Sequence, residues 1–327
     1  MSDVKWGIIS TARINRLFLE GARQASGVEI AAVASRDRAT AEEYARENEI
    51  ATAHGSYEAL LDDPQVEAVY IPLPNSMHVE WSIRALQSGK HVLCEKPMSR
   101  RTQEVERAFD AAEQHGRLLM EAFMWRHNPQ TARLTDLLEQ GAVGRIRMIR
   151  AAFGFVTNDP ANVRLQTALD GGGLMDVGSY CVSATRLLAG EPERVSAEQS
   201  LGGDGVDVAF AATMRHPNDI ISHFDCGLAL DSRDLLEIVG DAGSLRLDDP
   251  WHCRNPGIQL TRGNDTEHIE IERANSYGLE AENFSAAIRG NATPLLGRDD
   301  ATGQARTIEA LYRAADTGQA VTLASLS

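Results

Sequence analysis

Short apolar runs alternate with amphipathic stretches of helical length through the first 122 residues. This alternation is typical of βαβ units on a parallel sheet with helices over both faces. We predict five buried strands, at residues 4–10, 28–35, 66–72, 90–95 and 117–122. Helices are expected between them, at residues 14–25, 38–48, 76–88 and 102–115. The pattern predicts an α/β fold whose N-terminal domain, residues 1–122, is a doubly wound Rossmann sheet.

A different periodicity follows Arg126, where strand-like alternations outnumber helical stretches. A helix is expected to start at Asn128-Pro129 and to end near Gly141, because asparagine caps helices and proline fits the first helical position. Further helices are expected at residues 174–188, 279–289 and 300–317, and strands at 145–155, 194–201, 206–215, 220–230, 235–239 and 268–272. The elements predict a second α/β domain, residues 123–327, with an open, mainly antiparallel sheet that binds substrate and joins subunits.

Composition places the 327-residue chain among soluble globular proteins, with 43% hydrophobic and 24% charged residues. A formal net charge of −15 gives no general attraction to nucleic acid or to anionic lipid, so neither is expected as a partner. No apolar run reaches the roughly 18 residues of a membrane helix and no signal-peptide pattern opens the chain, which predicts a cytoplasmic protein. Four scattered cysteines without a CxxC pair predict neither a disulfide framework nor a zinc site.

The turn after the first predicted strand is a candidate dinucleotide site. Rossmann cofactor loops place glycines there so that a pyrophosphate can approach backbone N–H groups at the helix N-terminus. This chain has no glycine at the three fingerprint positions 10, 12 and 15, but each replacement is small. The segment is either an ordinary βα turn or a cofactor turn, and the βαβ context favours a cofactor turn made by Ser10, Thr11, Ala12, Arg13 and Ile14.

The end of the second predicted strand reads Ser35-Arg36-Asp37-Arg38 and bears on which dinucleotide is bound. An acidic residue accepts a hydrogen bond from the free ribose 2′-hydroxyl of NAD, whereas a hydroxyl and a guanidinium suit the 2′-phosphate of NADP. Ser35, Arg36 and Arg38 therefore favour NADP. Asp37 leaves NAD possible, with Arg36 stacking on adenine or with both arginines merely solvated.

The third predicted strand runs into Pro72-Leu73-Pro74-Asn75, and His78 follows. Two prolines hold this loop extended at the carboxyl end of the sheet, the edge at which doubly wound folds bind ligands. We predict that Pro72, Leu73, Pro74 and Asn75 border the cofactor, with Asn75 at the nicotinamide ribose unless it only caps the next helix. His78 is grouped with these cofactor contacts, although a packing or capping histidine is the simpler interpretation.

Four motifs occur together and in a fixed order: Pro74-Asn75-x-x-His78, Glu95-Lys96-Pro97, Glu-Ala-Phe-Met-Trp-Arg at 121–126, and Gly172-Gly173-x-x-Asp176-x-x-x-Tyr180. With them the chain resembles, essentially end to end, the Gfo/Idh/MocA family of NAD(P)-dependent oxidoreductases. Within that family it is most similar to the dimeric dihydrodiol dehydrogenases and the NADP-dependent D-xylose dehydrogenases. Inositol dehydrogenase-like members have a histidine at the position of Tyr180, so the tyrosine argues against a cyclitol substrate.

The resemblance implies that Lys96 reaches between nicotinamide and substrate, while Glu95 lies near the cofactor ribose. It also implies that Tyr180 is the general acid/base and that Asp176 orients substrate or relays a proton. The residue chemistry agrees, because an ammonium holds a reacting hydroxyl by a charge-assisted hydrogen bond and favours the phenolate of a neighbouring tyrosine. On a regular helix, Asp176 and Tyr180 would share one face. The alternatives are a solvated strand-end lysine, a core tyrosine and a helix-end aspartate.

Four further residues are candidates for the pocket. Trp125 and Arg126 fall at the predicted domain junction, where an indole could line the nicotinamide pocket and a guanidinium could bind a cofactor phosphate or a substrate oxygen. Arg164 and Tyr277 are expected to line a sugar pocket, although surface or packing roles are equally compatible with the sequence. No cluster of metal ligands is recognisable, so no metal is predicted.

Together these residues predict an enzyme that moves a hydride between NADP, with NAD possible, and a carbinol or carbonyl carbon of a sugar or polyol. The first choice is oxidation of an aldose such as D-xylose at C1. The alternatives are a trans-dihydrodiol dehydrogenase, a deoxysugar or inositol-type ketone reductase and, in another class, a non-catalytic NADP-binding sensor. We also expect a homo-oligomer, a dimer or a tetramer, formed through the C-terminal sheet.

Overall fold

The computed structural model describes residues 2–326, which form two compact units. Unit 1 comprises the chain up to Ser99 together with Gln103–His127 and Asn275–Thr302; unit 2 comprises Arg100–Thr102, Asn128–Ala274 and the chain from Gly303 onward. The domain boundary at residue 122 stays a prediction, and these units differ from it because residues 275–302 pack within unit 1. The indole of Trp6 contacts the ring of Phe284 there, with the ring centroids 5.8 Å apart.

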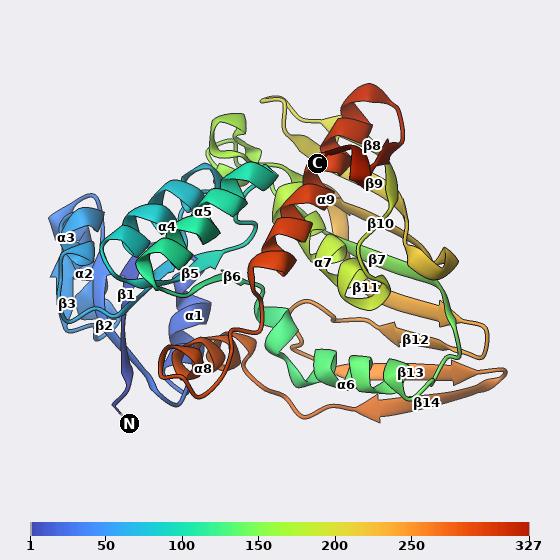
Figure 1. The fold of residues 1–327 in the computed structure, drawn as a ribbon, viewed down its shortest axis with the longest axis horizontal. Helices are drawn as coiled ribbons and strands as arrows, with labels where there is room; N and C mark the ends of the chain where they lie inside the picture. Colours follow the sequence, from blue (N-terminus) through green and yellow to red (C-terminus); the bar gives the residue numbers. More distant parts are fainter. Residues whose placement is uncertain (1, 327) are drawn as a thin grey trace. The chain divides into compact units, whose positions relative to one another are not determined.

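Unit 1 contains the predicted Rossmann sheet, and its described strands all pair in parallel in the order β3-β2-β1-β4-β5-β6 (Figure 1). This order is characteristic of doubly wound dinucleotide-binding folds. The central strands are almost wholly buried, as a parallel sheet with both faces covered requires. The strands are β1 (Val4–Ile9), β2 (Val28–Ala34), β3 (Thr52–His54), β4 (Ala68–Ile71), β5 (His91–Glu95) and β6 (Leu119–Ala122).

The sequence predicted five of these strands and missed β3. The three residues of β3 carry no apolar run, and the strand is defined by its pairing with Ala32–Ala34 of β2. The short helix α3 was also missed, because five residues are too few to show a helical period. The helices of unit 1 are α1 (Asn15–Ala22), α2 (Arg38–Glu47), α3 (Tyr57–Leu61), α4 (His78–Gln87), α5 (Thr102–His115, its first residue in unit 2) and α8 (Ser276–Ile288).

Unit 2 is built on a second sheet, with the order β14-β13-β12-β11-β7-β10-β9-β8-β15 in the described part of the chain. Its neighbouring strands pair antiparallel except for β7 and β10, which confirms the predicted open, mainly antiparallel sheet. Burial alternates along β9, where Phe210 and Ala212 are buried but Ala211 is exposed, so one face is packed and one is open. The strands are β7 (Ile146–Val156), β8 (Arg194–Leu201), β9 (Asp207–Arg215), β10 (Ile221–Gly227), β11 (Ala229–Gly240), β12 (Ser244–Leu247), β13 (Gly257–Arg262), β14 (Asp265–Glu270) and β15 (Val321–Thr322).

Several strand predictions for unit 2 were wrong in their bounds. β11 starts at Ala229, because Ala229, Arg233 and Asp234 pair with β7 although this polar stretch lacks an apolar pattern, with an irregularity in the register between Ala229 and Arg233. β12 and β13 were not predicted, and β14 ends two residues earlier than expected. β12 has only four residues, which is too short for alternation to be distinctive.

The helices of unit 2 include α7, which carries the predicted catalytic segment. A π-helical turn, η5 (Leu174–Gly178), leads directly into α7 (Ser179–Ala189). The buried face of the sheet meets this segment closely, since a Cβ at Gly178 would come within 2.6 Å of the Sγ atom of Cys226 on β10. The other helices are α6 (Pro129–Glu139) and α9 (Arg298–Thr317, its first five residues in unit 1).

Candidate active site

The turn that joins β1 to α1 is shaped by side chains in place of glycines. Ser10 has a φ of 107°, in a region that glycine normally occupies, and its Oγ accepts a hydrogen bond from the N–H of Ala12 at 3.3 Å. Asn15 is fully buried and donates from Nδ2 to the carbonyl of Ser10 at 2.8 Å. The segment 10–14 is partly exposed and opens helix α1, so small side chains leave its backbone open to a pyrophosphate. The residues present therefore fit a dinucleotide.

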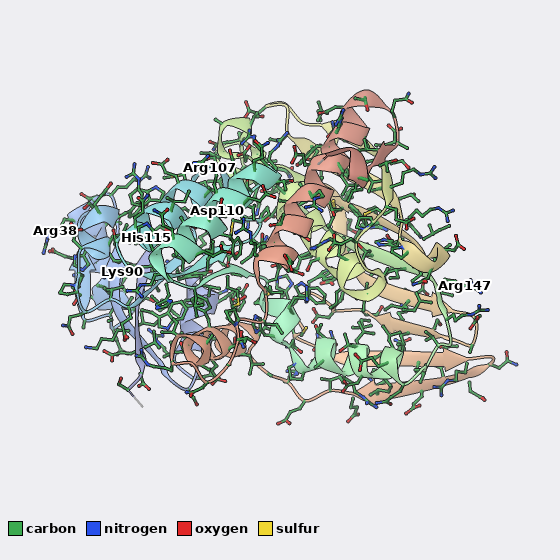
Figure 2. The ribbon with its side chains drawn as sticks, in the orientation of Figure 1. Arg38, Lys90, Arg107, Asp110, His115 and Arg147 are labelled. Carbon is green, nitrogen blue, oxygen red and sulfur yellow. The ribbon has the colours of Figure 1, made fainter. Side chains whose placement is uncertain are left out.

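The segment after β2 separates its acidic residue from its arginines. The Asp37 carboxylate caps α2, accepting from the N–H of Thr40 at 2.7 Å and from its hydroxyl at 2.8 Å. These hydrogen bonds lower the pKa of Asp37. Arg38 pairs with Glu42 at 2.8 Å and points outward from α2 (Figure 2), while Arg36 is exposed. Asp37 is thus engaged by its own helix, and Arg36 is the cation available to a ligand.

The loop after β4 is joined to the loop after β5 by a buried histidine. The side chain of His78 is 1% exposed, with Nδ1 2.9 Å from the Pro97 carbonyl oxygen and Nε2 2.7 Å from that of Leu73. Burial lowers the pKa of His78 to about 4, so the ring is neutral near neutral pH and donates from one nitrogen. His78 therefore joins the two loops, and its grouping with the cofactor contacts stays a prediction. Pro72 and Leu73 are likewise buried, whereas Pro74 and Asn75 are partly exposed.

Glu95 and Lys96 stand where β5 ends. The Glu95 carboxylate accepts from the Tyr70 hydroxyl at 2.6 Å and from the backbone N–H of Lys96 at 3.2 Å. Burial and the adjacent Glu95 raise the pKa of Tyr70, which keeps its phenol protonated as the donor. The loop beyond Lys96 is fixed by Met98, whose N–H donates to the buried Glu121 at 2.7 Å. The partly exposed Lys96 side chain therefore extends from a loop that hydrogen bonds hold in place.

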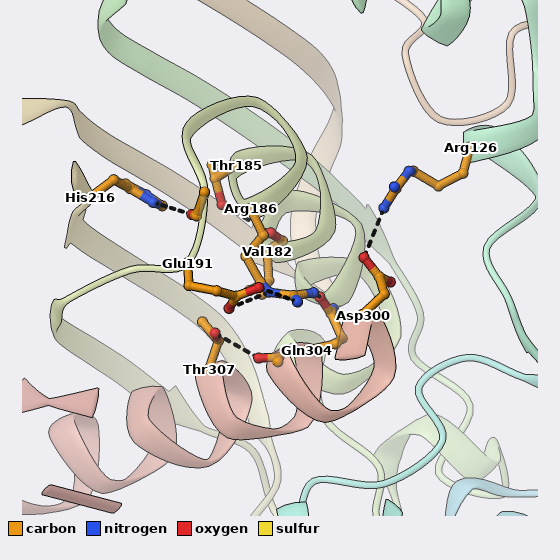
Figure 3. A network of polar contacts seen from close by, with 11 residues as sticks. Arg126, Val182, Thr185, Arg186, Glu191, His216, Asp300, Gln304 and Thr307 are labelled. Carbon is orange, nitrogen blue, oxygen red and sulfur yellow. Dashed lines mark hydrogen bonds and ion pairs between the residues drawn. The ribbon is translucent and has the colours of Figure 1, made fainter. Parts of the chain in front are cut away.

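The two candidates at the end of β6 differ in exposure. Trp125, in the 3-10 turn η2 (Met124–His127), is 1% exposed, and its role as a pocket-lining indole stays a prediction. Arg126 pairs with Asp300 at 3.3 Å, and this pair is drawn in Figure 3. Tyr277 lies in the first turn of α8, where its N–H donates to Asn275 at 3.1 Å, and it belongs to unit 1. The roles of Arg126 and Tyr277 toward ligands stay predictions.

In unit 2, the structure places Arg164 against Asp176, which precedes Tyr180 by four residues. Arg164 donates from Nε to Oδ2 of Asp176 at 2.6 Å, a charge-assisted contact that holds the carboxylate. Asp176 lies in the π-helical turn η5 and Tyr180 in the first turn of α7, so the regular-helix argument for their shared face was too simple. Single π turns inside helices are frequent at functional sites.

Tyr180 is bordered by aromatic residues that the sequence did not reveal. Its ring contacts Phe153 of β7 edge to face, with centroids 5.3 Å apart, and Trp251 at 5.9 Å. Phe153 also contacts the ring of His252 at 5.6 Å. Phe153 sits at a buried position of a predicted strand, which was a usable signal, whereas nothing near Trp251 and His252 in sequence pointed to the site. Phe153 and Tyr180 are buried and Trp251 fully so, and the cluster therefore packs the Tyr180 ring in apolar surroundings.

A buried arginine anchors the start of α7. Arg186 donates to Glu191 with Nη2 at 2.6 Å and to Gln304 with Nη1 at 3.0 Å (Figure 3). Gln304 of α9 in turn donates from Nε2 to the carbonyl of Ser179 at 2.7 Å, one residue before Tyr180. Sequence patterns did not predict this network, because Gln304 lies more than a hundred residues from Arg186.

Among the described residues, three side chains approach each other as metal ligands would. Asp234, Asp249 and His252 each offer an atom within 4.8 Å of the others. Such groups are common without an ion, so the expectation of a metal-free protein stays a prediction. Within residues 2–326 no helix has the length and apolarity to cross a bilayer.

The fold and these residues define a class of dinucleotide-dependent oxidoreductases built from a Rossmann unit and an open-sheet unit. Residues 4–123 match the family described as oxidoreductases with an NAD-binding Rossmann fold, and residues 131–246 match the GFO/IDH/MocA C-terminal domain. The chain belongs to the Gfo/Idh/MocA oxidoreductase family. The resemblance seen in the sequence motifs is thereby confirmed.

Relatives cover the chain almost end to end. A D-xylose 1-dehydrogenase (NADP(+)) of Haloferax volcanii is 37% identical over 97% of this chain and 99% of its own. A trans-1,2-dihydrobenzene-1,2-diol dehydrogenase of Danio rerio is 31% identical over 85% of this chain and 86% of its own. The crystal structure of an aldose-aldose oxidoreductase from Caulobacter crescentus superposes with a TM-score of 0.91 at 26% identity, covering 98% of this chain and 99% of that one. The protein is an oxidoreductase of this family.

Proposed function

We propose that this protein is an NADP-dependent dehydrogenase that oxidises an aldose, with D-xylose as first choice, at C1 to the lactone. The observation that carries the proposal is the segment 176–180, where a carboxylate held by Arg164 is followed after four residues by a phenol packed among aromatic rings. A carboxylate and a guanidinium bind sugar hydroxyls. The likeness to an NADP-dependent D-xylose 1-dehydrogenase supports the same assignment.

The chain's own residues would supply proton transfer and orientation. The hydride acceptor would be the nicotinamide of NADP⁺ held by these residues. Tyr180 takes the proton of the reacting hydroxyl as general base, and the Lys96 ammonium stabilises the negative charge that develops on oxygen. Asp176, held by Arg164, orients a neighbouring hydroxyl. The residues proposed to hold the dinucleotide are Ser10 to Ile14, Ser35, Arg36, Arg38, Asn75, Glu95 and Arg126.

A second candidate is a trans-dihydrodiol dehydrogenase, and the likeness to a trans-1,2-dihydrobenzene-1,2-diol dehydrogenase supports it. The apolar surroundings of Tyr180, made by Phe153 and Trp251, are compatible with a substrate that has an unsaturated ring. The deoxysugar or inositol-type ketone reductase and the NADP-binding sensor are further outcomes of the same test.

A substrate panel with both cofactors tests the proposal. Aldoses, a cyclitol and a trans-dihydrodiol are incubated with NADP⁺ or NAD⁺, and the absorbance of the reduced nicotinamide is followed. The expected result is fastest reduction of NADP⁺ with a pentose, and Tyr180→Phe should lower kcat roughly 100-fold or more. Tyr57→Phe, at a buried tyrosine of unit 1, is the control. Cofactor binding without turnover of any substrate would favour the sensor.

Assembly is part of the proposal. We propose that copies associate through the open face of the unit 2 sheet, in dimers or tetramers, because that face exposes Ala211, Thr213 and His223 in side-by-side registers of β9 and β10. Light scattering on the purified protein measures the mass. A monomer at all concentrations would contradict this part.

A further inference from the structure

A buried carboxylate fixes the turn from which the predicted catalytic segment starts. Asp207, the first residue of β9, is 2% exposed. Its Oδ2 accepts a hydrogen bond from the backbone N–H of Leu174 at 2.6 Å, and its Oδ1 accepts one from the hydroxyl of Tyr312 on α9 at 2.8 Å. Leu174 is the first residue of η5. Both oxygens of a buried carboxylate are therefore used, one by this turn and one by a distant helix.

The turn has been shaped around this carboxylate. Gly172 has a φ of 128°, a conformation that side-chain-bearing residues rarely adopt. A Cβ at this position would collide with Oδ1 of Asp207 and come 3.0 Å from the Tyr312 hydroxyl. A Cβ at Gly173 would approach Oδ2 of Asp207 to 3.2 Å. The two glycines thus let the backbone approach Asp207 as closely as its hydrogen bonds require.

The same turn is bonded directly to Asp176 and its partner. The carbonyl of Gly172 accepts the N–H of Asp176 at 3.0 Å, and the N–H of Gly172 donates to the carbonyl of Arg164 at 2.9 Å. Arg164 also binds the Asp176 side chain. A displacement of the Gly172 backbone would therefore move Asp176 and the residue that orients it together, and it would shift the start of the helix that carries Tyr180.

Arg100 stabilises the far side of the Tyr312 ring. Its guanidinium lies 4.4 Å from the ring centroid, within cation–π distance. Burial and Asp207 raise the pKa of Tyr312, so its phenol remains a protonated donor to the carboxylate. Arg100 follows Lys96 by four residues and clusters with unit 2. The contacts form a chain from Arg100 through Tyr312 and Asp207 to Leu174.

We propose that Asp207 and Tyr312 are positioning residues of the proposed reaction, which hold the Gly172–Leu174 turn so that Asp176 and Tyr180 keep their catalytic orientation. The inference rests on the proposed function. Neither residue needs to touch substrate, since Asp207 is buried and both its oxygens are occupied. Displacements of about 1 Å in a catalytic group can cost roughly 100-fold in rate, so a side chain that fixes this turn controls turnover.

Three variants separate the contacts. Asp207→Ala removes both acceptors and is expected to lower kcat roughly 100-fold. Tyr312→Phe removes one donor, keeps the ring for Arg100, and is expected to lower kcat about tenfold. Asp207→Asn can still accept from Leu174 and can donate to the Tyr312 oxygen, so it should retain most of the activity. The Kd of NADP⁺ should stay within about twofold in all three, because the residues proposed to bind it belong to unit 1.

A readout independent of catalysis is amide exchange at Leu174. Its N–H donates to Asp207, so its exchange should be about tenfold faster in Tyr312→Phe and faster still in Asp207→Ala. Thr307→Val is the matched control, since it removes a buried hydroxyl of α9 whose bond goes to Gly303 and not to the turn.

The outcomes separate the two proposals. Unchanged exchange at Leu174 in folded Tyr312→Phe would overturn the anchoring, and faster exchange with unchanged kcat would show a purely structural contact and overturn the positioning role. Loss of kcat in Thr307→Val equal to that in Tyr312→Phe would also overturn it. If the wild-type protein turns over no substrate, the proposed function fails, and the exchange at Leu174 still decides whether Asp207 and Tyr312 hold the turn.

Discussion

Unit 1 and unit 2 hold their candidate groups in different ways. In unit 1, Ser10, Asn75 and Lys96 each follow a strand of one parallel sheet, and the carboxyl ends of parallel strands share one edge. In unit 2, Asp176 and Tyr180 lie on one short segment whose orientation depends on partners far away in sequence. Topology alone assembles the first group, whereas individual side chains maintain the second.

The difference teaches where each unit tolerates change. Helices cover the strands of unit 1, and its strand-end loops are joined mainly through backbone carbonyls, as His78 illustrates. Unit 2 instead uses buried charged side chains around α7, such as Asp207 of β9 and Arg186 of α7 itself. Variants at strand ends of unit 1 should change chemistry or cofactor binding, while variants beneath α7 should change orientation and stability.

The largest expected effect is at Lys96. Lys96→Ala should lower kcat by about 1,000-fold, because the ammonium that stabilises the developing oxyanion is lost, with the cofactor Kd nearly unchanged. Lys90 at the other end of β5 provides the contrast, since its Nζ donates to the carbonyls of Asp63 at 2.6 Å and Val66 at 2.8 Å. Lys90→Met should reduce the melting temperature and spare turnover. Near-normal turnover of Lys96→Ala would refute its assigned role.

The next effect concerns the scaffold of α7. Arg186→Ala removes the guanidinium that donates to the side-chain oxygen of Gln304, and it leaves a buried void. This variant should therefore lower the free energy of unfolding by about 3 kcal/mol. Arg246→Ala is the control, because its pair with Asp248 at 2.9 Å is exposed and should contribute at most about 1 kcal/mol. Urea unfolding of both variants measures the difference. Equal losses would mean that the Arg186 network behaves as a surface pair.

Sequence patterns predicted the fold of unit 1 well, because βαβ alternation is local. They also nominated Lys96, Asp176 and Tyr180, because each belongs to a motif whose residues lie close together in sequence, and their catalytic roles stay predictions. They missed the packing of Phe153 against Trp251, a contact that joins residues almost a hundred positions apart. They also missed Asp207, since a lone aspartate at a strand start gives no sign of the turn that it holds. Long-range side-chain partners are set by tertiary packing, which a single sequence does not display.

The two units should respond to acid with opposite sign. His78 in unit 1 has its pKa lowered from 6.5 to about 4, so its contribution to stability is present above pH 6.5 and is lost as pH falls toward 4. Asp234 in unit 2 has its pKa raised from 3.8 to about 7, mainly by burial and then by Asp249, so its contribution is greatest below pH 3.8 and is lost as pH rises toward 7.

Two variants measure how the stability of each unit changes with pH. His78→Gln keeps a donor for the loop carbonyls, and it should reduce the stability that unit 1 loses between about pH 7 and pH 5 by about 2 kcal/mol. Asp234→Asn should instead remove stability that unit 2 gains as the pH falls. This change in stability should be smaller than that for His78, because the Asp234 side chain is only partly buried. Amide exchange of β4 and of β11 at the two pH values reports each unit separately. Slopes of the same sign in both units would contradict the assignment.

The smallest expected effect is on cofactor choice in unit 1. Arg36→Ala should weaken NADP⁺ about tenfold, roughly 1.4 kcal/mol, because an exposed guanidinium that pairs with the 2′-phosphate is lost. NAD⁺ should change little. Arg46→Ala is the matched control, since Arg46 lies on the same helix α2, pairs with Glu43 at 3.9 Å and is not among the residues proposed to hold the dinucleotide.

Calorimetric titration with both cofactors at two salt concentrations sharpens this test. A true phosphate contact weakens as salt rises, and the difference between wild type and Arg36→Ala should shrink with it. Equal losses of NADP⁺ and NAD⁺, insensitive to salt, would mean that Arg36 stacks on adenine. Because the Asp37 carboxylate caps α2, an acidic partner for a free ribose is already occupied, and this occupancy is the reason to expect the phosphate-bearing cofactor.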